Sequence, residues 1–384
     1  MSLGDGTPTA FLCAAIVSLH AGDAARGQGC EGGQWRTMAP MSIARQETGA
    51  ARIGDQVYVV GGLLAGSPLR ATDTVEAYDI ALDEWSFIAP MPAALDHMAV
   101  AAVGGRLYVM GGYSADFVPR SGVHIYDPVA NAWSAGAVMP SARGACWAAA
   151  HDGLIYLFGG AGPLGGARRN TFIYDPVMNV WESGVDMPTA REHLVAAAAG
   201  EFIYVIGGRS GGAFNVVERY HPGSNTWATM TPMPTARSAS ACAAFGPRII
   251  VAGGEVPMLH SVNEVYDILS DSWTCQASMA IPRHGIAAVM LNDRILTPAG
   301  GVVQGLSPTN AVDSFIPERL PGDFDGDGDA DLTDYERWTA CLAGPGAEVA
   351  PECVLMDLDV DGDVDLADFD VFQEGFTGSW SASP

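Results

Sequence analysis

One motif recurs six times along residues 35–316 and restricts the architectures that this chain can adopt. Each copy contains a short β-branched or aromatic run that ends at a glycine pair, and the pairs begin at residues 61, 111, 159, 207, 253 and 300. In five copies a tryptophan stands seven residues after a tyrosine, at Tyr78/Trp85, Tyr126/Trp133, Tyr174/Trp181, Tyr220/Trp227 and Tyr266/Trp273. A period of 46 to 50 residues accommodates four short strands with their turns. The sequence therefore predicts six similar four-stranded units.

The composition of the repeats predicts how these units pack. Runs such as 57–60 and 203–206 consist of consecutive β-formers, as expected for buried strands. A four-stranded unit has two apolar faces that only neighbouring units can bury, and the tyrosines and tryptophans supply aromatic area at each junction. Segments 99–102, 148–150 and 195–199 are rich in alanine. Small side chains suit the innermost strands, which crowd around a central axis.

The two ends of the repeat region complement each other. The sixth repeat has Phe315 in place of the tyrosine and has no tryptophan seven residues later. Trp35, by contrast, has no tyrosine before it and stands 50 residues ahead of Trp85. We therefore expect residues 35–38 to form the outer strand of the last unit, which would leave no open seam between the first and last units.

The glycine pair, the spaced tyrosine and tryptophan and the period resemble those of the kelch family over residues 35–316. The resemblance implies an all-β, six-bladed β-propeller whose last blade is closed by the N-terminal strand. It does not imply one function, because propellers are scaffolds on which different sites are built.

Two sets of loop positions are expected to share one face of this propeller. One set follows the glycine pairs: Leu63, Tyr113, Ala161, Arg209, Glu255 and Val302. The other stands two residues after a recurring arginine, or after Leu95 in the second repeat: Glu47, His97, Ala145, His193, Ala239 and Gly285. In kelch proteins these positions tend to face the ligand, so the resemblance implies a ligand site at the polar members, Glu47, His97, Tyr113, His193, Arg209 and Glu255. The alternative is that they are ordinary solvated loop residues.

Other chemistry is less favoured at these loops. Two histidines and a carboxylate suit a metal ion, but their positions on different blades argue against a metal site. The recurring arginines Arg45, Arg143, Arg191, Arg237 and Arg283 are expected to be structural and to bond loop carbonyls. No nucleophile elbow or phosphate loop is present, so the sequence identifies no catalytic residue.

An acidic segment follows residue 321 and contains two copies of a twelve-residue loop, 34 residues apart. Each has carboxylates at positions 1, 3, 5, 7, 9 and 12 and glycine at position 6. The predicted calcium ligands are Asp323, Asp325, Asp327, Asp329, Asp331 and Asp334 in the first loop, and Asp357, Asp359, Asp361, Asp363, Asp365 and Asp368 in the second. Calcium takes six to eight oxygen ligands, so the segment is expected to bind two calcium ions. Cys341 and Cys353 flank a Gly-Pro-Gly turn between the loops and are predicted to form a disulfide.

Apolar residues follow both loops at helical spacing, so this small α-helical segment resembles a dockerin, with aspartate at position 12 in place of the glutamate of ordinary EF-hands. The resemblance implies docking to a cohesin-like protein. Loop positions 10 and 11 are Leu332-Thr333 and Leu366-Ala367, whereas many dockerins carry Ser-Thr-like pairs there. Self-docking and cell-surface attachment therefore remain open.

Charge and hydropathy limit the partners and suggest export. The formal net charge is −25, and residues 321–384 contain 17 acidic residues against one arginine. Such a chain is unsuited to nucleic acids and to anionic membrane surfaces, and it has no apolar run of membrane-spanning length. The apolar run Ala10–Leu19 has the length of a signal-peptide core, which predicts a secreted or cell-surface protein. The pairing of Cys30, Cys146, Cys242 and Cys275 stays open.

These features divide the chain and define three candidate functions. The predicted parts are a leader at 1–25, the propeller at 30–320, the dockerin-like domain at 321–378 and a disordered tail at 379–384.

The favoured function is a secreted module that binds protein or carbohydrate and is tethered by its tail, in polysaccharide degradation or cell-surface assembly. The alternatives are a sugar-active enzyme, such as a sialic-acid-mutarotase-like protein, and a structural or adhesive surface protein. A deep polar pocket at the channel mouth would favour the enzyme, and an alanine-lined mouth would favour the others.

Overall fold

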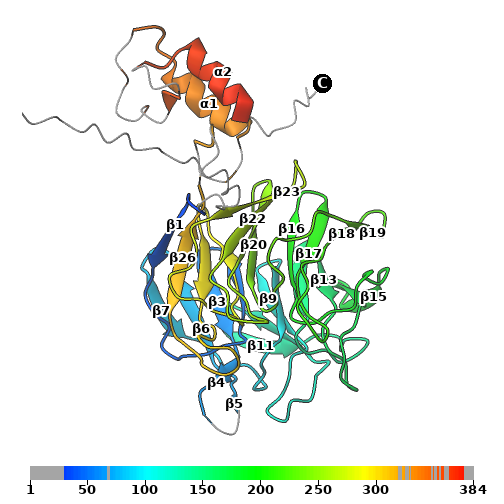
Figure 1. Cartoon of the computed structure of the whole chain (residues 1–384). Helices are drawn as coiled ribbons and strands as arrows, with labels where there is room; N and C mark the ends of the chain where they lie inside the picture. The colour runs from blue at the N-terminus through cyan, green and yellow to red at the C-terminus, as the bar shows by residue number, and fades with distance from the viewer. Residues whose placement is uncertain are drawn as a thin grey trace, which may run out of the picture.

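The computed structural model describes residues 30–66, 70–318, 322–324, 328, 330–346, 349, 353, 356–358 and 363–375. Residues 30–318 form six four-stranded antiparallel sheets arranged as the blades of a propeller (Figure 1). From the inner to the outer strand, the first three blades are β2 (Gly49–Ile53), β3 (Gln56–Val60), β6 (Val75–Asp79) and β7 (Glu84–Phe87); β8 (Ala99–Val103), β9 (Arg106–Met110), β10 (Val123–Asp127) and β11 (Ala132–Ala135); and β12 (Trp147–His151), β13 (Leu154–Phe158), β14 (Thr171–Asp175) and β15 (Val180–Ser183).

The other blades repeat this order. They are β16 (Val195–Ala199), β17 (Phe202–Ile206), β18 (Val217–His221) and β19 (Thr226–Thr229); β20 (Ala241–Phe245), β21 (Arg248–Ala252), β22 (Asn263–Asp267) and β23 (Ser272–Gln276); and β24 (Val289–Met290), β25 (Ile295–Pro298), β26 (Val312–Ile316) and β1 (Gln34–Thr37). A two-stranded hairpin, β4 (Leu63–Leu64) with β5 (Arg70–Ala71), projects from the first blade. The predicted six-bladed propeller is confirmed, and the alanine-rich segments form its inner strands.

The N-terminal strand closes the ring, as predicted. β1 pairs with β26, and Trp35 lies opposite Phe315 in the register. The rings of these two residues contact each other at a centroid distance of 4.9 Å. Trp35 therefore occupies the place in the sixth blade that the tryptophan seven residues after the tyrosine occupies in the other blades.

The blades are joined by the indole groups. The tryptophan on the outer strand of each blade donates a hydrogen bond of 2.6 to 2.9 Å from Nε1 to a carbonyl oxygen just after the outer strand of the preceding blade: Trp35 to Ala277, Trp85 to Ala39, Trp133 to Ala89, Trp181 to Ala137, Trp227 to Val185 and Trp273 to Thr231. The first and last blades are bonded in the same way, so these contacts also run around the closed ring.

A side chain five residues after each repeat tyrosine completes this junction. In blade two, the Tyr126 hydroxyl donates to Asn131 Oδ1, and the Ala89 N–H of the preceding blade donates to the same oxygen. Asp83, Asn179, Asn225 and Asp271 make equivalent bonds in blades one, three, four and five. The recurring tyrosine and tryptophan therefore supply directed polar contacts as well as apolar area.

The recurring arginines are fully or nearly fully buried and structural, as predicted. Arg45 Nη1 donates to the carbonyls of Gly61 and Thr74, and its Nη2 donates to Glu76 at 2.9 Å. Arg191, Arg237 and Arg283 pair in the same way with Glu218, Glu264 and Asp313, two residues before the repeat aromatic residue. In blade two Leu95 replaces the arginine and His124 replaces the acid. Removal of one partner from such a buried pair is strongly destabilising.

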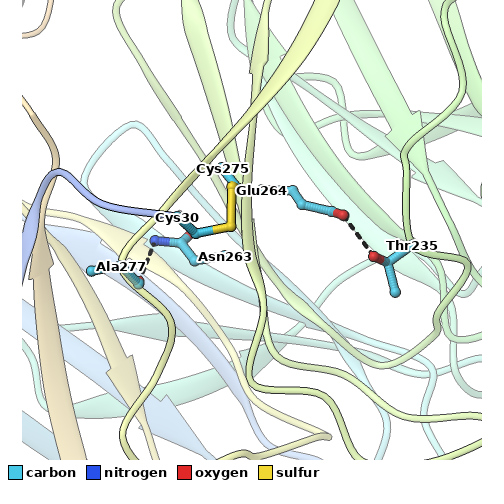
Figure 2. The surroundings of a disulfide bond; sticks show 6 residues. All are labelled: Cys30, Thr235, Asn263, Glu264, Cys275 and Ala277. Atoms are coloured by element: carbon cyan, nitrogen blue, oxygen red, sulfur yellow. Dashed lines mark hydrogen bonds between the residues drawn. A yellow bond between two sulfur atoms is a disulfide. The ribbon is translucent and has the colours of Figure 1, made fainter. Parts of the chain in front are cut away.

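A disulfide between Cys30 and Cys275 fastens the segment before β1 to the outer strand of blade five. Figure 2 shows this bond beside Asn263, which donates from Nδ2 to the Ala277 carbonyl at 3.3 Å. Cys146 and Cys242 are buried free thiols. The sequence did not determine this pairing.

The sixth repeat has a different register from the one that its glycines suggested. Ala299 N–H bonds to the Ala311 carbonyl, as Gly61 N–H bonds to that of Thr74, and Gly300 N–H bonds to Arg45 as Gly62 N–H bonds to Leu95. The equivalent pair is therefore Ala299-Gly300, with Ala299 at φ +62°. The position that follows the pair is Gly301, and the assignment of Val302 to it was wrong.

The C-terminal segment contains two short helices, α1 (Leu332–Cys341) and α2 (Leu366–Gly375). Trp338, Phe372, Phe324, Val364 and Met356 form a small core between them, and the predicted Cys341–Cys353 disulfide is present. The helices lie beyond the propeller face opposite the β4–β5 hairpin (Figure 1). Within the described residues, neither helix has the length and hydropathy of a membrane span. The predicted leader at 1–25 and the tail at 379–384 lie outside the described residues.

Candidate functional site

A closed ring of six backbone hydrogen bonds surrounds the axis where the blades meet. The second residue after each arginine position, or after Leu95 in blade two, donates its N–H to the carbonyl of the equivalent residue in the preceding blade, over 2.8 to 3.0 Å: Glu47 to Gly285, His97 to Glu47, Ala145 to His97, His193 to Ala145, Ala239 to His193 and Gly285 to Ala239. We call these six residues the hub ring. They bring loops that are about 50 residues apart in the sequence together around the propeller axis.

All six residues of the hub ring have positive φ, between +49° and +56°. This left-handed conformation is uncommon for residues other than glycine and is unfavourable for L-residues. The closed ring of hydrogen bonds compensates for it. At Glu47, His97 and His193 the backbone therefore holds a polar side chain in a fixed direction near the axis.

Three residues of the hub ring, Glu47, His97 and His193, line a pocket of about 250 Å³ at the mouth of the channel. Its lining includes Glu47, His97, His193, Arg209, Glu255 and His284, together with the apolar side chains of Leu63, Phe117 and Leu306. A wider hollow of about 350 Å³ opens on the opposite face and is lined largely by alanines of the inner strands, with Arg52 among them. Of these two hollows, the one on the face that carries the two predicted loop sets is therefore the one where polar groups converge.

Arg209 bonds to two other predicted residues, Glu255 and His193, and to Glu192. Its Nη1 donates to Glu255 Oε1 at 2.7 Å, its Nη2 lies 3.1 Å from His193 Nε2, and its Nε donates to Glu192 Oε1 at 2.9 Å. Burial disfavours the charged guanidinium, but the two carboxylates outweigh this and raise the pKa of Arg209. Burial would raise the pKa of Glu192, but His193 and Arg209 lower it to about 2. The Glu192 carboxylate is therefore ionised at neutral pH.

His97 lies between two carboxylates. Its Nδ1 is 2.5 Å from Asp96 Oδ1, and its Nε2 is 3.4 Å from Glu47 Oε2. Burial lowers the pKa of His97, but Glu47 and Asp96 raise it above its ordinary value. Burial also opposes ionisation of Glu47, yet the three surrounding histidines hold its pKa well below the usual range. The pKa of His193 is lowered, first by burial and then by the positive charges of His97 and Arg209.

All six predicted polar residues lie together. Tyr113 is the most peripheral and contacts His97 edge-to-face at a centroid distance of 5.5 Å, while the His97 and His193 rings are 5.0 Å apart. Sequence reasoning missed Asp96, Glu192 and His284. Each stands directly after an arginine position, or after Leu95, and forms a β-bridge to the residue that follows the glycine pair. The position adjacent to the recurring arginine was the signal that could have identified them.

The comparisons with known proteins agree with this architecture. The family model described as the KLHDC2/KLHL20/DRC7 Kelch-repeats domain matches residues 47–254, which is more than half of the chain. The chain belongs to this kelch-repeat family. A second model, the Kelch motif, matches residues 236–280.

One solved structure, titled "Structure of YjhT", is similar to this kelch chain with a TM-score of 0.63 and 16% sequence identity, over 71% of this chain and 95% of the other. At this identity the likeness supports the fold alone. No curated protein matches the chain. Kelch propellers commonly bind proteins, so the family provides a general binding scaffold.

The acidic segment after the kelch propeller brings carboxylates together. Asp334 accepts hydrogen bonds from the N–H groups of Phe324 and Asp331, and Asp368 accepts equivalent bonds from those of Leu358 and Asp365. The two loops are therefore folded alike at position 12. Within the described residues, one carboxylate oxygen from each of Asp363, Asp365 and Asp368 lies within 4.8 Å of the others.

The chemistry of these groups fits calcium. Asp323, Asp334, Asp363 and Asp368 are buried, and oxygen donors of this kind are those that calcium prefers. Asp331 and Asp357 are also described. The other predicted ligands, Asp325, Asp327, Asp329, Asp359 and Asp361, lie outside the described residues.

Proposed function

We propose that this protein is an exported kelch propeller that binds a small protein or carbohydrate determinant in its mouth pocket and is tethered through a calcium-binding, dockerin-like tail. The observation that carries the proposal is the convergence of Glu47, His97, His193, Arg209 and Glu255 on a single pocket. Residues from different blades meet there on a rigid ring, which is typical of binding sites built on scaffolds.

The pocket suits a small polar determinant. Its volume of about 250 Å³ lies just below the usual range of small-molecule sites, so it suits a ligand no larger than a monosaccharide or the end of a peptide. Its carboxylates, imidazoles and guanidinium offer both donors and acceptors, while Leu63 and Phe117 provide an apolar wall. This combination fits a ligand with hydroxyl or amide groups on one side and an apolar face on the other.

The placement of the tail supports a tethering role. Arg248, at the turn between β20 and β21, donates from Nη1 to the Glu318 carbonyl at 2.7 Å, and a Cβ at Gly328 would meet the Phe245 ring at 2.8 Å. The helices of the tail lie beyond the face opposite the β4–β5 hairpin (Figure 1), whereas the mouth pocket is lined by Leu63 of that hairpin. A partner bound to the tail would therefore leave the mouth free. The two disulfides support export, because they persist in oxidising compartments.

Ligand binding is tested by screening glycans and peptides against the full chain and comparing two arginine variants. Arg209→Met removes a donor from the mouth pocket, and Arg52→Met changes an arginine in the opposite hollow. We expect Arg209→Met to weaken binding of any ligand found by about tenfold or more, because one buried charge-assisted hydrogen bond has that value, and Arg52→Met to leave it unchanged. Equal effects of the two variants would contradict the assignment of the mouth pocket.

A sugar-active enzyme is the second candidate, and the convergent polar mouth favours it. His97 stands between an ionised Glu47 and Asp96, and imidazole–carboxylate pairs of this kind serve as general acids and bases. The test is the rate of anomeric exchange of sugars, including sialic acid, measured by NMR. Acceleration that Glu47→Gln abolishes would support this function, and no acceleration by the intact chain would exclude it for the sugars tested.

A further inference from the structure

The hub ring holds a second potential function at its centre, which does not depend on the identity of the proposed ligand. Glu47, His97 and His193 each place one ligand atom within 4.8 Å of those of the other two. These residues come from three different blades. Their separation along the chain argued against a metal site, but the ring of backbone hydrogen bonds brings the three loops together.

The spacing of these atoms is close to that of a metal site. Two ligands bound to zinc at about 2.1 Å in a tetrahedral arrangement lie about 3.4 Å apart. Glu47 Oε2 and His97 Nε2 are 3.4 Å apart. The third ligand atom, from His193, lies within 4.8 Å of both.

Carboxylates stand behind both histidines. Asp96 Oδ1 is 2.5 Å from His97 Nδ1, and Glu192 Oε1 is 3.3 Å from His193 Nδ1. In metal sites a carboxylate at one ring nitrogen fixes the tautomer and directs the other nitrogen to the ion. At His97 the hydrogen bond to Asp96 leaves Nε2 as the atom that a metal would use. At His193 the nearby Glu192 carboxylate favours the same choice by its charge.

The local charge favours a cation. Glu47, Asp96, Glu192 and Glu255 bring four carboxylates to this cluster. Among the described residues, Arg209 is the one arginine bonded to it, and His284 Nδ1 lies 3.4 Å from Glu47 Oε1. Arg209 Nη2 contacts His193 Nε2 at 3.1 Å. It would have to release that nitrogen, but its bonds to Glu192 and Glu255 can hold it beside the site.

We propose that Glu47, His97 and His193 bind a divalent transition-metal ion on the axis of the propeller, with Asp96 and Glu192 as positioning residues. A two-histidine, one-carboxylate set is a common protein ligand set for such ions. Three protein ligands leave coordination positions open, and these three residues line the mouth pocket of about 250 Å³. The ligand class for those positions is a small molecule with an oxygen donor.

The proposal is tested by titrating the calcium-saturated full chain with zinc, so that the tail carboxylates are already occupied. We expect one zinc ion to bind with its affinity reduced at least about 100-fold in His97→Asn and in His193→Asn, since even an outer partner is worth 10- to 100-fold. Asparagine tolerates the positive φ at both positions. His151→Asn, on the inner strand β12, is the matched control and should bind as the parent does.

Two further measurements make the test independent of how these variants fold. Arg209→Met removes the cation at His193 Nε2 and should strengthen zinc binding. If Glu47, His97 and His193 had a purely structural role, this variant would leave the zinc affinity unchanged. X-ray absorption at the zinc edge of the unmodified protein should show two imidazole ligands. No zinc uptake beyond the calcium sites, or a zinc ion without imidazole ligands, would overturn the proposal.

Discussion

At the scale of single residues, the buried arginine–carboxylate pairs show how the repeat is stabilised. Arg237 and Glu264 are both buried and bonded to each other, and Thr235 Oγ1 also donates to Glu264. Removal of one member leaves a charge without compensation in a medium that solvates it poorly. Blade two shows an alternative, because it has a leucine and a histidine at these positions.

We therefore expect Arg237→Leu to lower the free energy of unfolding by about 3 to 5 kcal/mol, as measured by denaturant titration. The control is the double variant Arg237→Leu with Glu264→His, which reproduces the residue pair of blade two. It should recover most of the loss because no buried carboxylate remains unpaired. A double variant as unstable as the single one would show that the arginine stabilises mainly through its bonds to loop carbonyls.

At the scale of elements, β1 is the strand on which closure of the propeller depends. It joins blade six from the other end of the chain, and Cys30–Cys275 fastens the segment just before it to blade five. The bond links positions 245 residues apart, so it restricts the unfolded chain over most of the propeller.

Replacing both Cys30 and Cys275 by alanine should lower propeller stability by about 2 to 5 kcal/mol, with no free thiol introduced by the change. The measurement is thermal unfolding followed by near-UV circular dichroism. The matched control replaces Cys341 and Cys353 by alanine, which removes the disulfide of the tail. If both double variants shift the propeller transition equally, the stabilisation does not come from closure of the ring.

At the scale of the whole molecule, the propeller and the tail are expected to respond differently to calcium. The propeller is closed by strand pairing and has extensive cores between its blades. The tail has only a small core and many carboxylates, and two unit charges 4 Å apart repel by roughly 4 kcal/mol at an effective dielectric constant near 20. Calcium binding and folding of the tail should therefore be coupled.

Chelation should reduce the helical signal of the tail and expose residues 322–375 to protease, while the near-UV spectrum of the propeller stays unchanged. Adding calcium back should reverse both effects. The variant Asp334→Asn with Asp368→Asn should show the chelated behaviour in the presence of calcium. A tail that takes up no calcium in calorimetry, or that resists protease equally with and without chelator, would contradict the coupling.

The sequence by itself determined the repeat architecture, because regularly spaced glycines, tyrosines and tryptophans act through local turns and neighbour contacts that recur in every blade. It also identified the partner of Trp35, since the sixth repeat lacked a tryptophan. It could not determine the Cys30–Cys275 pairing, the Ala299-Gly300 register or the roles of Asp96, Glu192 and His284. These depend on which loops meet at the axis, and only the closed ring of blades, with its backbone hydrogen bonds between residues about 50 positions apart, decides that.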